Sequence, residues 1–295
     1  MNIEIVKFNA ADGVVLDGIL RKCGQYTKKI LIQLHGMTSN CFKNREKVIA
    51  ERVAEIGIDT LCFNNRGSDV IRYAKKIVEG EDQSFLAGTA YENIEEAYFD
   101  IVGAIEFAKS LGYEEIFLQG HSLGSTKVVY TYNTLKGENN PLLDNIKAII
   151  LLSLVDIPGT VEMEADTSYI DYALEKEKQG KEMDLMPFES YINPMSVKTF
   201  LRYTKYNEDI DFARYGKQDD EFEVLNKIEV PIFMRWGNDN EMIKQDAKEL
   251  VELMNNKIKN DCKDIDYIDG ANHSYSDYED ELGEQIKNFI IKNNI

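Results

Sequence analysis

Hydrophobic and polar positions alternate along this chain in two different ways. Residues 3–8 and 14–21 alternate with a period of two on either side of Ala11-Asp12-Gly13, which predicts a β-hairpin. Most of the remaining chain alternates between short apolar runs and longer segments with helical spacing, which predicts strands followed by helices. The predicted strands span 29–34, 58–64, 115–119, 146–152, 230–236 and 264–268, and the predicted helices span 43–56, 91–111, 125–135, 244–256 and 279–293.

Several of the predicted strands, such as residues 146–152, carry apolar side chains on both faces. A strand of this kind is typical of a parallel sheet that is buried between helices. Strands that alternate with helices along the chain also favour a mostly parallel sheet, because a crossover helix joins parallel neighbours. We therefore expect an α/β fold in which helices cover both faces of the sheet.

Residues 156–223 interrupt this alternation between two predicted core strands. We expect them to form a cap or lid insertion on a core made of residues 1–155 and 224–295. The insertion holds 17 acidic and 8 basic residues. It is also rich in aromatic residues and methionines, a few of which we expect to line a ligand pocket: Tyr169, Tyr172, Met183, Met186, Phe188, Tyr191, Met195, Phe200, Tyr203 and Tyr206. A second, shorter excursion spans residues 68–90.

Composition narrows the range of partners. The chain has 295 residues and a formal net charge of -18, which nucleic acids and anionic membranes would repel. We therefore expect neither a nucleic-acid nor a membrane partner. We expect no signal peptide, because the chain begins in a strand pattern, and no apolar run approaches the roughly 20 residues that span a bilayer. These features predict a cytoplasmic protein with reduced cysteines. Without a metal-ligand cluster or a Gly-rich phosphate loop, no metal and no cofactor are expected.

The segment Gly120-His121-Ser122-Leu123-Gly124 lies between a predicted strand and a predicted helix. A Gly-x-Ser-x-Gly in this context is the nucleophile elbow, a turn so tight that small residues are needed on both sides of the serine. The turn lifts the hydroxyl above the edge of the sheet. We therefore expect Ser122 to be a catalytic nucleophile.

A serine hydroxyl needs a base that takes up its proton, and imidazole suits that task at neutral pH. The chain has three histidines, His35, His121 and His273. His121 leaves the strand beside the serine and should point away from its hydroxyl, and His35 precedes a glycine at the end of another strand. His273 lies in a polar loop between a predicted strand and the C-terminal helix, so we predict that His273 is the base.

A serine nucleophile and a histidine base usually work with a third residue, a carboxylate, to form a catalytic triad. In chain order this carboxylate lies between the serine and the histidine, and it follows a strand. The predicted strand 230–236 leads into Gly237-Asn238-Asp239-Asn240-Glu241.

Two backbone donors are also required for the developing oxyanion. Leu123 can provide one at the start of its helix. The predicted strand 29–34 leads into His35-Gly36-Met37, and we assign the second donor to the N–H of Met37.

These motifs resemble those of the α/β-hydrolase superfamily over nearly the whole chain. The residues that carry the resemblance are His35-Gly36-Met37, Asn64-Asn65-Arg66-Gly67, Gly120–Gly124, Gly237–Glu241 and Gly270-Ala271-Asn272-His273. Within the superfamily the chain is similar to esterase-like proteins, which include hydrolases of aromatic-acid and siderophore esters. The resemblance implies the α/β-hydrolase fold with a cap insertion, and serine chemistry.

The acid loop departs from the pattern of this superfamily. Related enzymes usually carry the acid three residues after the glycine, and Asn240 occupies that position here. Asp239 and Glu241 flank Asn240. We favour Asp239 as the acid, with Glu241 as the alternative, and Asn240 itself remains a third possibility.

The combined features predict a carboxylic ester hydrolase that acts on a small-molecule ester through an acyl-enzyme. Thioesterase, amidase and carbon–carbon bond hydrolase activities use the same kind of site. A second class of function is a catalytically weakened binding protein, which is favoured if Asn240 occupies the acid position. Arg66 follows the predicted strand 58–64, where it either binds a substrate carboxylate or, as we favour, holds its own loop.

Overall fold

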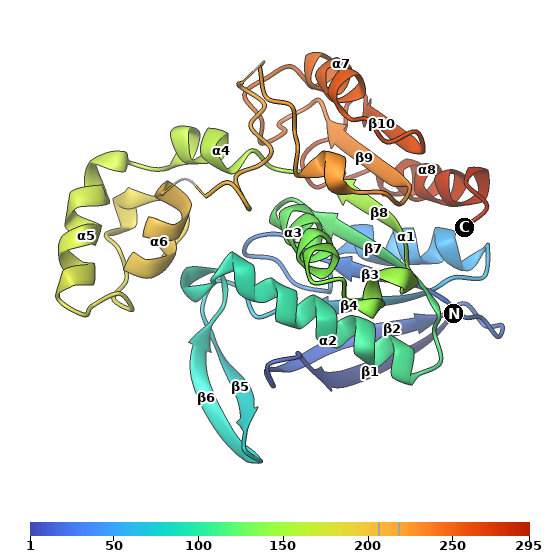
Figure 1. Ribbon diagram of the computed structural model, residues 1–295, viewed down its shortest axis with the longest axis horizontal. Coiled ribbons are helices and arrows are strands. Elements are labelled where there is room, and N and C mark those ends of the chain that lie inside the picture. Colours follow the sequence, from blue (N-terminus) through green and yellow to red (C-terminus); the bar gives the residue numbers. More distant parts are fainter. Residues whose placement is uncertain (206, 218) are drawn as a thin grey trace.

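The computed structural model describes residues 1–205, 207–217 and 219–295. Its centre is a sheet with the strand order β1-β2-β4-β3-β7-β8-β9-β10 (Figure 1). The pairs β1–β2 and β2–β4 are antiparallel, and the other neighbours in this sheet are parallel. The strands are β1 (Asn2–Asn9), β2 (Val15–Lys22), β3 (Lys29–Leu34), β4 (Asp59–Asn64), β7 (Glu115–His121), β8 (Ile146–Leu152), β9 (Ile232–Gly237) and β10 (Lys263–Ile268).

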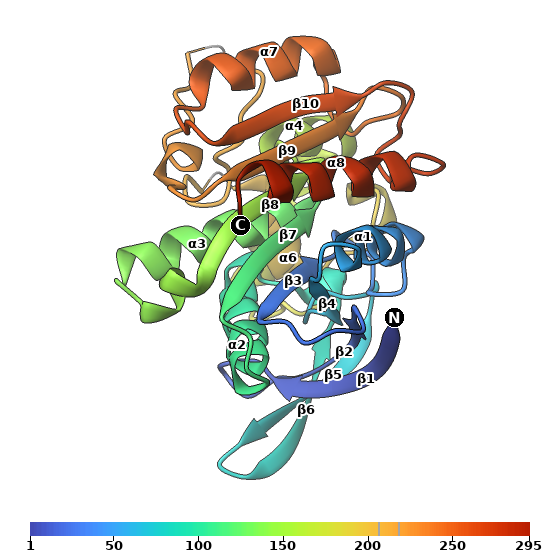
Figure 2. The same cartoon turned by 90° about the vertical axis from the view of Figure 1, so that its right-hand side faces the viewer.

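Helices cover both faces of the sheet, as the sequence predicts (Figure 2). Helices α1 (Asn44–Ala54) and α8 (Glu279–Lys292) pack on one face. The other face is covered by α2 (Ala97–Ser110), α3 (Leu123–Gly137) and α7 (Ala247–Lys257). The packing of β8 explains why this strand is apolar at every position except Lys147. Ile149 and Leu151 join the core beside α2 and α3, and Ile150 and Leu152 join the core beside α1 and α8.

Helix α2 is shorter than the predicted helix 91–111. Two short 3-10 helices, Thr89–Tyr91 and Ile94–Glu96, precede it. The backbone is extended at Glu92 and Asn93, so a continuous α-helix cannot run through them. The apolar spacing of the whole segment therefore overstates the length of the helix. The preceding excursion forms a separate hairpin of β5 (Arg72–Val78) and β6 (Glu81–Ala87), which projects from the body of the molecule (Figure 1).

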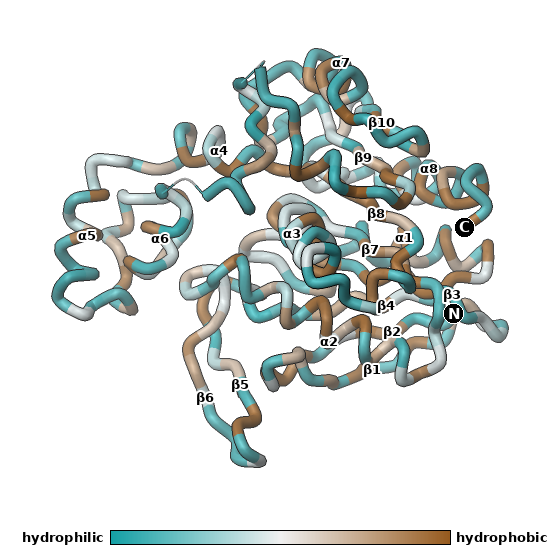
Figure 3. The backbone as a smooth tube through the Cα atoms, viewed as in Figure 1, coloured by the Kyte–Doolittle hydropathy of each residue, from teal (hydrophilic) through white to brown (hydrophobic). Residues whose placement is uncertain are grey.

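The predicted insertion contains α4 (Ile157–Glu164), α5 (Ile170–Lys178) and α6 (Val197–Thr204). Helices α5 and α6 lie together at one side of the molecule, away from the sheet (Figure 1). Their hydrophobic residues form a cluster of their own with Leu123 and Ile94 of the core. Many backbone positions along α5 are hydrophilic (Figure 3), in keeping with the acidic composition. Tyr206, one of the aromatic residues noted in the insertion, lies outside the described residues.

Among the described residues, no helix is both long enough and apolar enough to cross a membrane. The four cysteines are free thiols. Cys41 is fully buried, and burial raises the pKa of its thiol to about 11. A thiol that stays protonated at neutral pH is a poor nucleophile.

Candidate active site

The carboxyl ends of four parallel strands bring the predicted site residues to one edge of the sheet. Leu34 of β3 pairs with Gly120 of β7, and Gly237 of β9 pairs with Ile268 of β10. The loops that follow these strands therefore emerge on the same side, which is where open α/β sheets bind their ligands. The nucleophile elbow, the His35–Met37 loop, the acid loop and the histidine loop all start there.

Ser122 stands on a strained turn. Its backbone φ of 55° and ψ of -128° lie in a region that residues other than glycine rarely adopt. The turn is tight, because a Cβ atom on Gly120 would lie only 2.3 Å from the carbonyl oxygen of Gly124. The N–H of Ser122 donates to the carbonyl oxygen of Leu152 at 2.8 Å, which ties the turn to β8. These features are those expected of a nucleophile elbow.

His273 lies in the same cavity as Ser122. The ring of His121 contacts the backbone of His273: Nε2 of His121 lies 2.7 Å from the carbonyl oxygen of His273. The two rings also pack against each other with their centroids 4.9 Å apart. Burial and the nearby charge of Arg45 hold the pKa of His121 well below its ordinary value. His121 is therefore neutral, and it donates a hydrogen bond through Nε2–H because a carbonyl oxygen can only accept.

The carboxylate that contacts His273 belongs to Glu241 and not to Asp239. Glu241 Oε1 forms a short contact with Nδ1 of His273, and the Glu241 side chain is only 4% exposed. Asp239 is exposed, and its Oδ1 accepts a hydrogen bond from the side chain of Asn240. The expectation that Asp239 is the partner of His273 is therefore wrong in this geometry. Asn240 does not contact His273 either, since its amide points to Asp239.

The backbone of the acid loop explains this outcome. Asp239 N–H donates to the carbonyl oxygen of Ala271 at 3.0 Å, which ties the two loops together. Asn240 then has a φ of 49°, in the left-handed region that asparagine tolerates better than most residues. The chain turns back at this point, and Glu241 Oε2 accepts a hydrogen bond from the N–H of Gly237 at 2.9 Å. The one-residue displacement of the acid is thus accommodated by the turn and by the longer side chain of glutamate.

The Glu241 carboxylate is held in its ionised form. Burial alone would raise the pKa of this carboxyl group. The contact with His273 and the hydrogen bonds from Gly237 and Ser153 outweigh burial and hold the pKa below its ordinary value. An ionised carboxylate at Nδ1 fixes the ring orientation and stabilises a positive charge on it.

The predicted oxyanion donors also face this region. Gly36 packs directly against the nucleophile, because a Cβ atom on Gly36 would lie 2.8 Å from the Cβ atom of Ser122. Thr38, with a φ of 55°, donates from its N–H to Thr89 Oγ1 at 2.8 Å, which fixes the loop. Within the described part of the chain, the N–H groups of Met37 and Leu123 have no acceptor. They are therefore free to bind a ligand oxygen.

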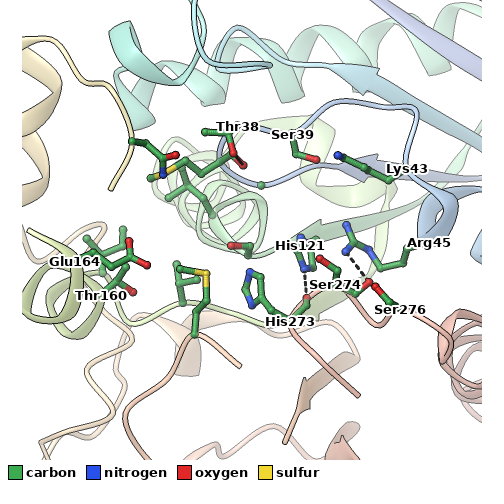
Figure 4. A pocket seen from close by; sticks show the side chains of 18 of the residues that line it. Thr38, Ser39, Lys43, Arg45, His121, Thr160, Glu164, His273, Ser274 and Ser276 are labelled. Carbon is green, nitrogen blue, oxygen red and sulfur yellow. Dashed lines mark hydrogen bonds between the residues drawn. The ribbon is translucent and has the colours of Figure 1, made fainter. Parts of the chain in front are cut away.

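A cavity of about 520 Å³ joins these groups. Met37, Ser122, Leu123 and His273 line it, together with residues of the insertion such as Tyr191. Glu164 and Thr160 of α4 lie at one end of the cavity, Lys43 and Arg45 lie at the other, and His273 lies between the two ends (Figure 4). A cavity of this size accommodates a small organic molecule.

Arg66 holds its own loop and does not line the cavity. Its guanidinium is 5% exposed and contacts three carboxylates, those of Asp12, Glu96 and Asp100. The favoured structural interpretation is therefore confirmed. In the part of the chain that the structure describes, no group of three or more histidine, cysteine, aspartate or glutamate side chains is arranged to hold a metal ion.

Sequence reasoning missed two residues that support the site. Ser153 follows β8 and donates from Oγ to Glu241 Oε2 at 2.8 Å. Tyr275 lies two residues after His273, and its hydroxyl oxygen is 3.0 Å from Ser153 Oγ. Both are buried polar residues at strand or loop ends, and no short motif marks them. The sequence offers one signal for them: both follow predicted strands, at the edge of the sheet where the site residues lie.

Comparison with known proteins supports the fold. No family model matches the sequence, and no curated protein matches it. Among solved structures, the chain is similar to Est1E from Butyrivibrio proteoclasticus, with a TM-score of 0.65, 17% identity and 98% of each chain covered. It is also similar to the α/β hydrolase GrgF from Penicillium sp. sh18, with a TM-score of 0.67, 16% identity and 100% of each chain covered. A monoglyceride lipase from Saccharomyces cerevisiae has a TM-score of 0.64 and 13% identity, with 99% of this chain and 96% of that chain covered.

The chain therefore has the α/β-hydrolase fold, which confirms the fold class expected from the sequence.

Proposed function

We propose that this protein hydrolyses carboxylic esters of small molecules through Ser122, His273 and Glu241. The observation that carries the proposal is the arrangement at the cavity. A serine on a strained elbow and a histidine line one cavity, and a buried carboxylate contacts the far nitrogen of that histidine. This is the division of roles in a nucleophile–base–acid triad.

In the proposed reaction, His273 Nε2 takes the proton of Ser122 Oγ while Oγ attacks the ester carbonyl carbon. The carbonyl oxygen becomes an oxyanion, which the N–H groups of Met37 and Leu123 stabilise. The alcohol leaves with the proton held by His273, and an acyl-enzyme remains on Ser122. Water, activated by the same imidazole, then releases the acid and restores the serine.

The neighbours guide the choice of substrates. A structure of Est1E is described with ferulic acid bound, and another neighbour is a monoglyceride lipase. Purified protein should therefore be tested on p-nitrophenyl esters of graded chain length, a feruloyl ester, a monoglyceride and a matched thioester. We expect ester turnover, and we expect a fluorophosphonate to label the wild-type protein but not Ser122→Ala. Turnover that persists in Ser122→Ala would contradict the proposal.

A weakened binding protein was the alternative from a different class, and it depended on Asn240 as the partner of His273. The contact of Glu241 with His273 supports the hydrolase over this alternative. The thioester in the panel tests one of the related reactions that use the same groups. A higher kcat/KM for the thioester than for its oxygen ester would make this protein a thioesterase on the same triad.

A further inference from the structure

A connected set of buried hydrogen bonds lies behind Glu241. Ser153 Oγ donates to Glu241 Oε2 at 2.8 Å and lies 3.0 Å from the hydroxyl oxygen of Tyr275. Tyr275 in turn lies 2.7 Å from the carbonyl oxygen of Arg235, to which its hydroxyl can donate. Ser153 and Tyr275 are 1% and 0% exposed, so water does not compete for these contacts.

The backbone of Ser153 is itself unusual. Its φ is 45°, in the left-handed region, directly after the end of β8. Two contacts hold it there: its N–H donates to the carbonyl oxygen of Arg235 at 2.7 Å and lies 3.1 Å from the hydroxyl oxygen of Tyr275. A serine at such a φ costs conformational free energy, and this cost is usually seen where function requires a particular geometry. Here the geometry directs the serine hydroxyl at the candidate acid.

Each Glu241 oxygen has two donors. Oε1 meets His273 and the N–H of Met242, and Oε2 meets the N–H of Gly237 and the hydroxyl of Ser153. Three of these donors belong to the acid loop itself or to His273. Gly237 is the last residue of β9 and Ser153 directly follows β8. Ser153 therefore ties the carboxylate to a second strand of the sheet, through a side-chain donor.

Two buried tyrosines, Tyr275 and Tyr215, lie close enough to Glu241 to feel its charge. Burial and the charge of Glu241 raise the pKa of Tyr275, and burial together with Asp156 and Glu241 raises that of Tyr215. Both phenols therefore keep their protons at neutral pH. Tyr275 can consequently act as a permanent O–H donor to Ser153 or to the Arg235 carbonyl oxygen.

We propose that Ser153, supported by Tyr275, is a positioning residue that keeps Glu241 ionised and directed at His273. This inference rests on the proposed function for its catalytic meaning. Glu241 comes one residue later than the usual position of the acid, and its side chain has one more rotatable bond than aspartate. An anchor from β8 compensates for that freedom.

The test is the titration of the Glu241–His273 pair, followed by NMR of the imidazole signals. Burial holds the pKa of His35 at about 3 and that of His121 well below its ordinary value. The imidazole signal of His273 is assigned by its absence from the spectrum of His273→Gln. Ser153→Gly is the main variant, because glycine accepts the positive φ while removing the hydroxyl. Ser153→Ala and Tyr275→Phe are the second and third variants, and Ser84→Ala on exposed β6 is the matched control.

Loss of the Ser153 hydroxyl leaves Oε2 with one donor and raises the proton affinity of the pair. We expect the midpoint to move upward by about 0.5 pH unit in both Ser153 variants, the effect of one ordinary hydrogen bond. Tyr275→Phe should move it less and in the same direction, and Ser84→Ala should leave it unchanged. The acid limb of kcat/KM should move with the midpoint.

An unchanged midpoint in a folded Ser153→Gly or Ser153→Ala protein would overturn the proposal, even if the stability fell. The titration needs no substrate, so it separates the two ideas. Absence of ester turnover with a shifted midpoint would reject the proposed function and keep the positioning role. Ester turnover with an unshifted midpoint would keep the proposed function and reject the positioning role of Ser153.

Discussion

His121 Nε2 lies 2.7 Å from the carbonyl oxygen of His273, so the residue beside the proposed nucleophile anchors the loop that carries the proposed base. The contact joins β7 to the loop after β10 across the edge of the sheet. The low pKa of His121 keeps it neutral, and a neutral ring has one N–H to donate. The first x of this Gly-x-Ser-x-Gly motif, His121, therefore helps to hold the loop of His273 in place.

His121→Phe tests this support, because phenylalanine keeps the ring packing and removes the N–H. We expect kcat to fall about tenfold, which corresponds to about 1.4 kcal/mol, the scale of one hydrogen bond. KM should change little. His121→Gln, which restores a donor, should recover part of the loss in the same steady-state assay. Equal losses in the two variants would show that packing, and not the hydrogen bond, is what matters.

The acid can be identified by comparing two conservative substitutions. Glu241→Gln removes the charge at Nδ1 of His273, and we expect kcat to fall by about 10⁴, the cost of this change in the serine protease template. Asp239→Asn should change kcat by less than about tenfold, because an exposed charge interacts weakly through solvent. Steady-state kinetics on the best ester of the panel measures both effects.

The opposite pattern would return the role to Asp239, as first favoured from the sequence. Two mild effects would mean that neither carboxylate stabilises the imidazolium during turnover. In that case Asn240→Asp should raise activity, since it places a carboxylate at the position usual for related enzymes. With Glu241 as the acid, Asn240→Asp should not raise activity, because the side chain at this position contacts Asp239 and not His273.

The oxyanion donors can be tested through the backbone. Met37→Pro removes the N–H, and we expect kcat to fall by about 10²–10³, the usual cost of one oxyanion donor. Met37→Ala keeps the N–H and should be mild. Circular dichroism would check that the proline variant is folded. A folded proline variant that behaves like the alanine variant would place the donor elsewhere.

The sequence predicts the framework of this molecule well because the framework follows from local patterns. The apolar run of β8 and the helical spacing of α8 fix their own elements, and chain order then limits the topology. Ser122 follows from a motif in its structural context, and His273 from elimination among three histidines. Each of these inferences needs information from only a short stretch of chain.

The acid and its supports could not be predicted in the same way. Asp239, Asn240 and Glu241 are three consecutive polar residues, and their order does not say which one faces the sheet. The positive φ of Asn240 and the bond from Asp239 N–H to Ala271 decide it. The hydrogen bond joins Asp239 to a residue 32 positions further along the chain, so no local pattern contains the answer. Ser153 is chosen by the same kind of long-range contact.

Two buried histidines predict how stability depends on pH. Burial, with the nearby charge of Lys127, lowers the pKa of His35 to about 3, and its Nε2 has no hydrogen-bond partner among the described residues. Burial also lowers the pKa of His121, well below its ordinary value. The unfolded chain binds a proton at each histidine below about pH 6.5, whereas the folded protein does not. The stabilising contribution of His35 is therefore complete above that pH and is lost as the pH falls towards about 3.

For His35 alone, the free energy of unfolding should fall by about 2 kcal/mol between about pH 7.5 and pH 5. Some carboxylates act in the opposite sense. Burial raises the pKa of Asp211 to about 6, so protonation of Asp211 adds stability as the pH falls through that value. The informative quantity is therefore the difference between wild type and His35→Gln, which removes one titrating group and leaves Asp211 in both proteins. Urea unfolding at the two pH values should show a pH dependence that is about 2 kcal/mol smaller in the variant, whatever its absolute stability. Equal pH dependence in the two proteins would mean that His35 takes up its proton in the folded state, in conflict with its complete burial.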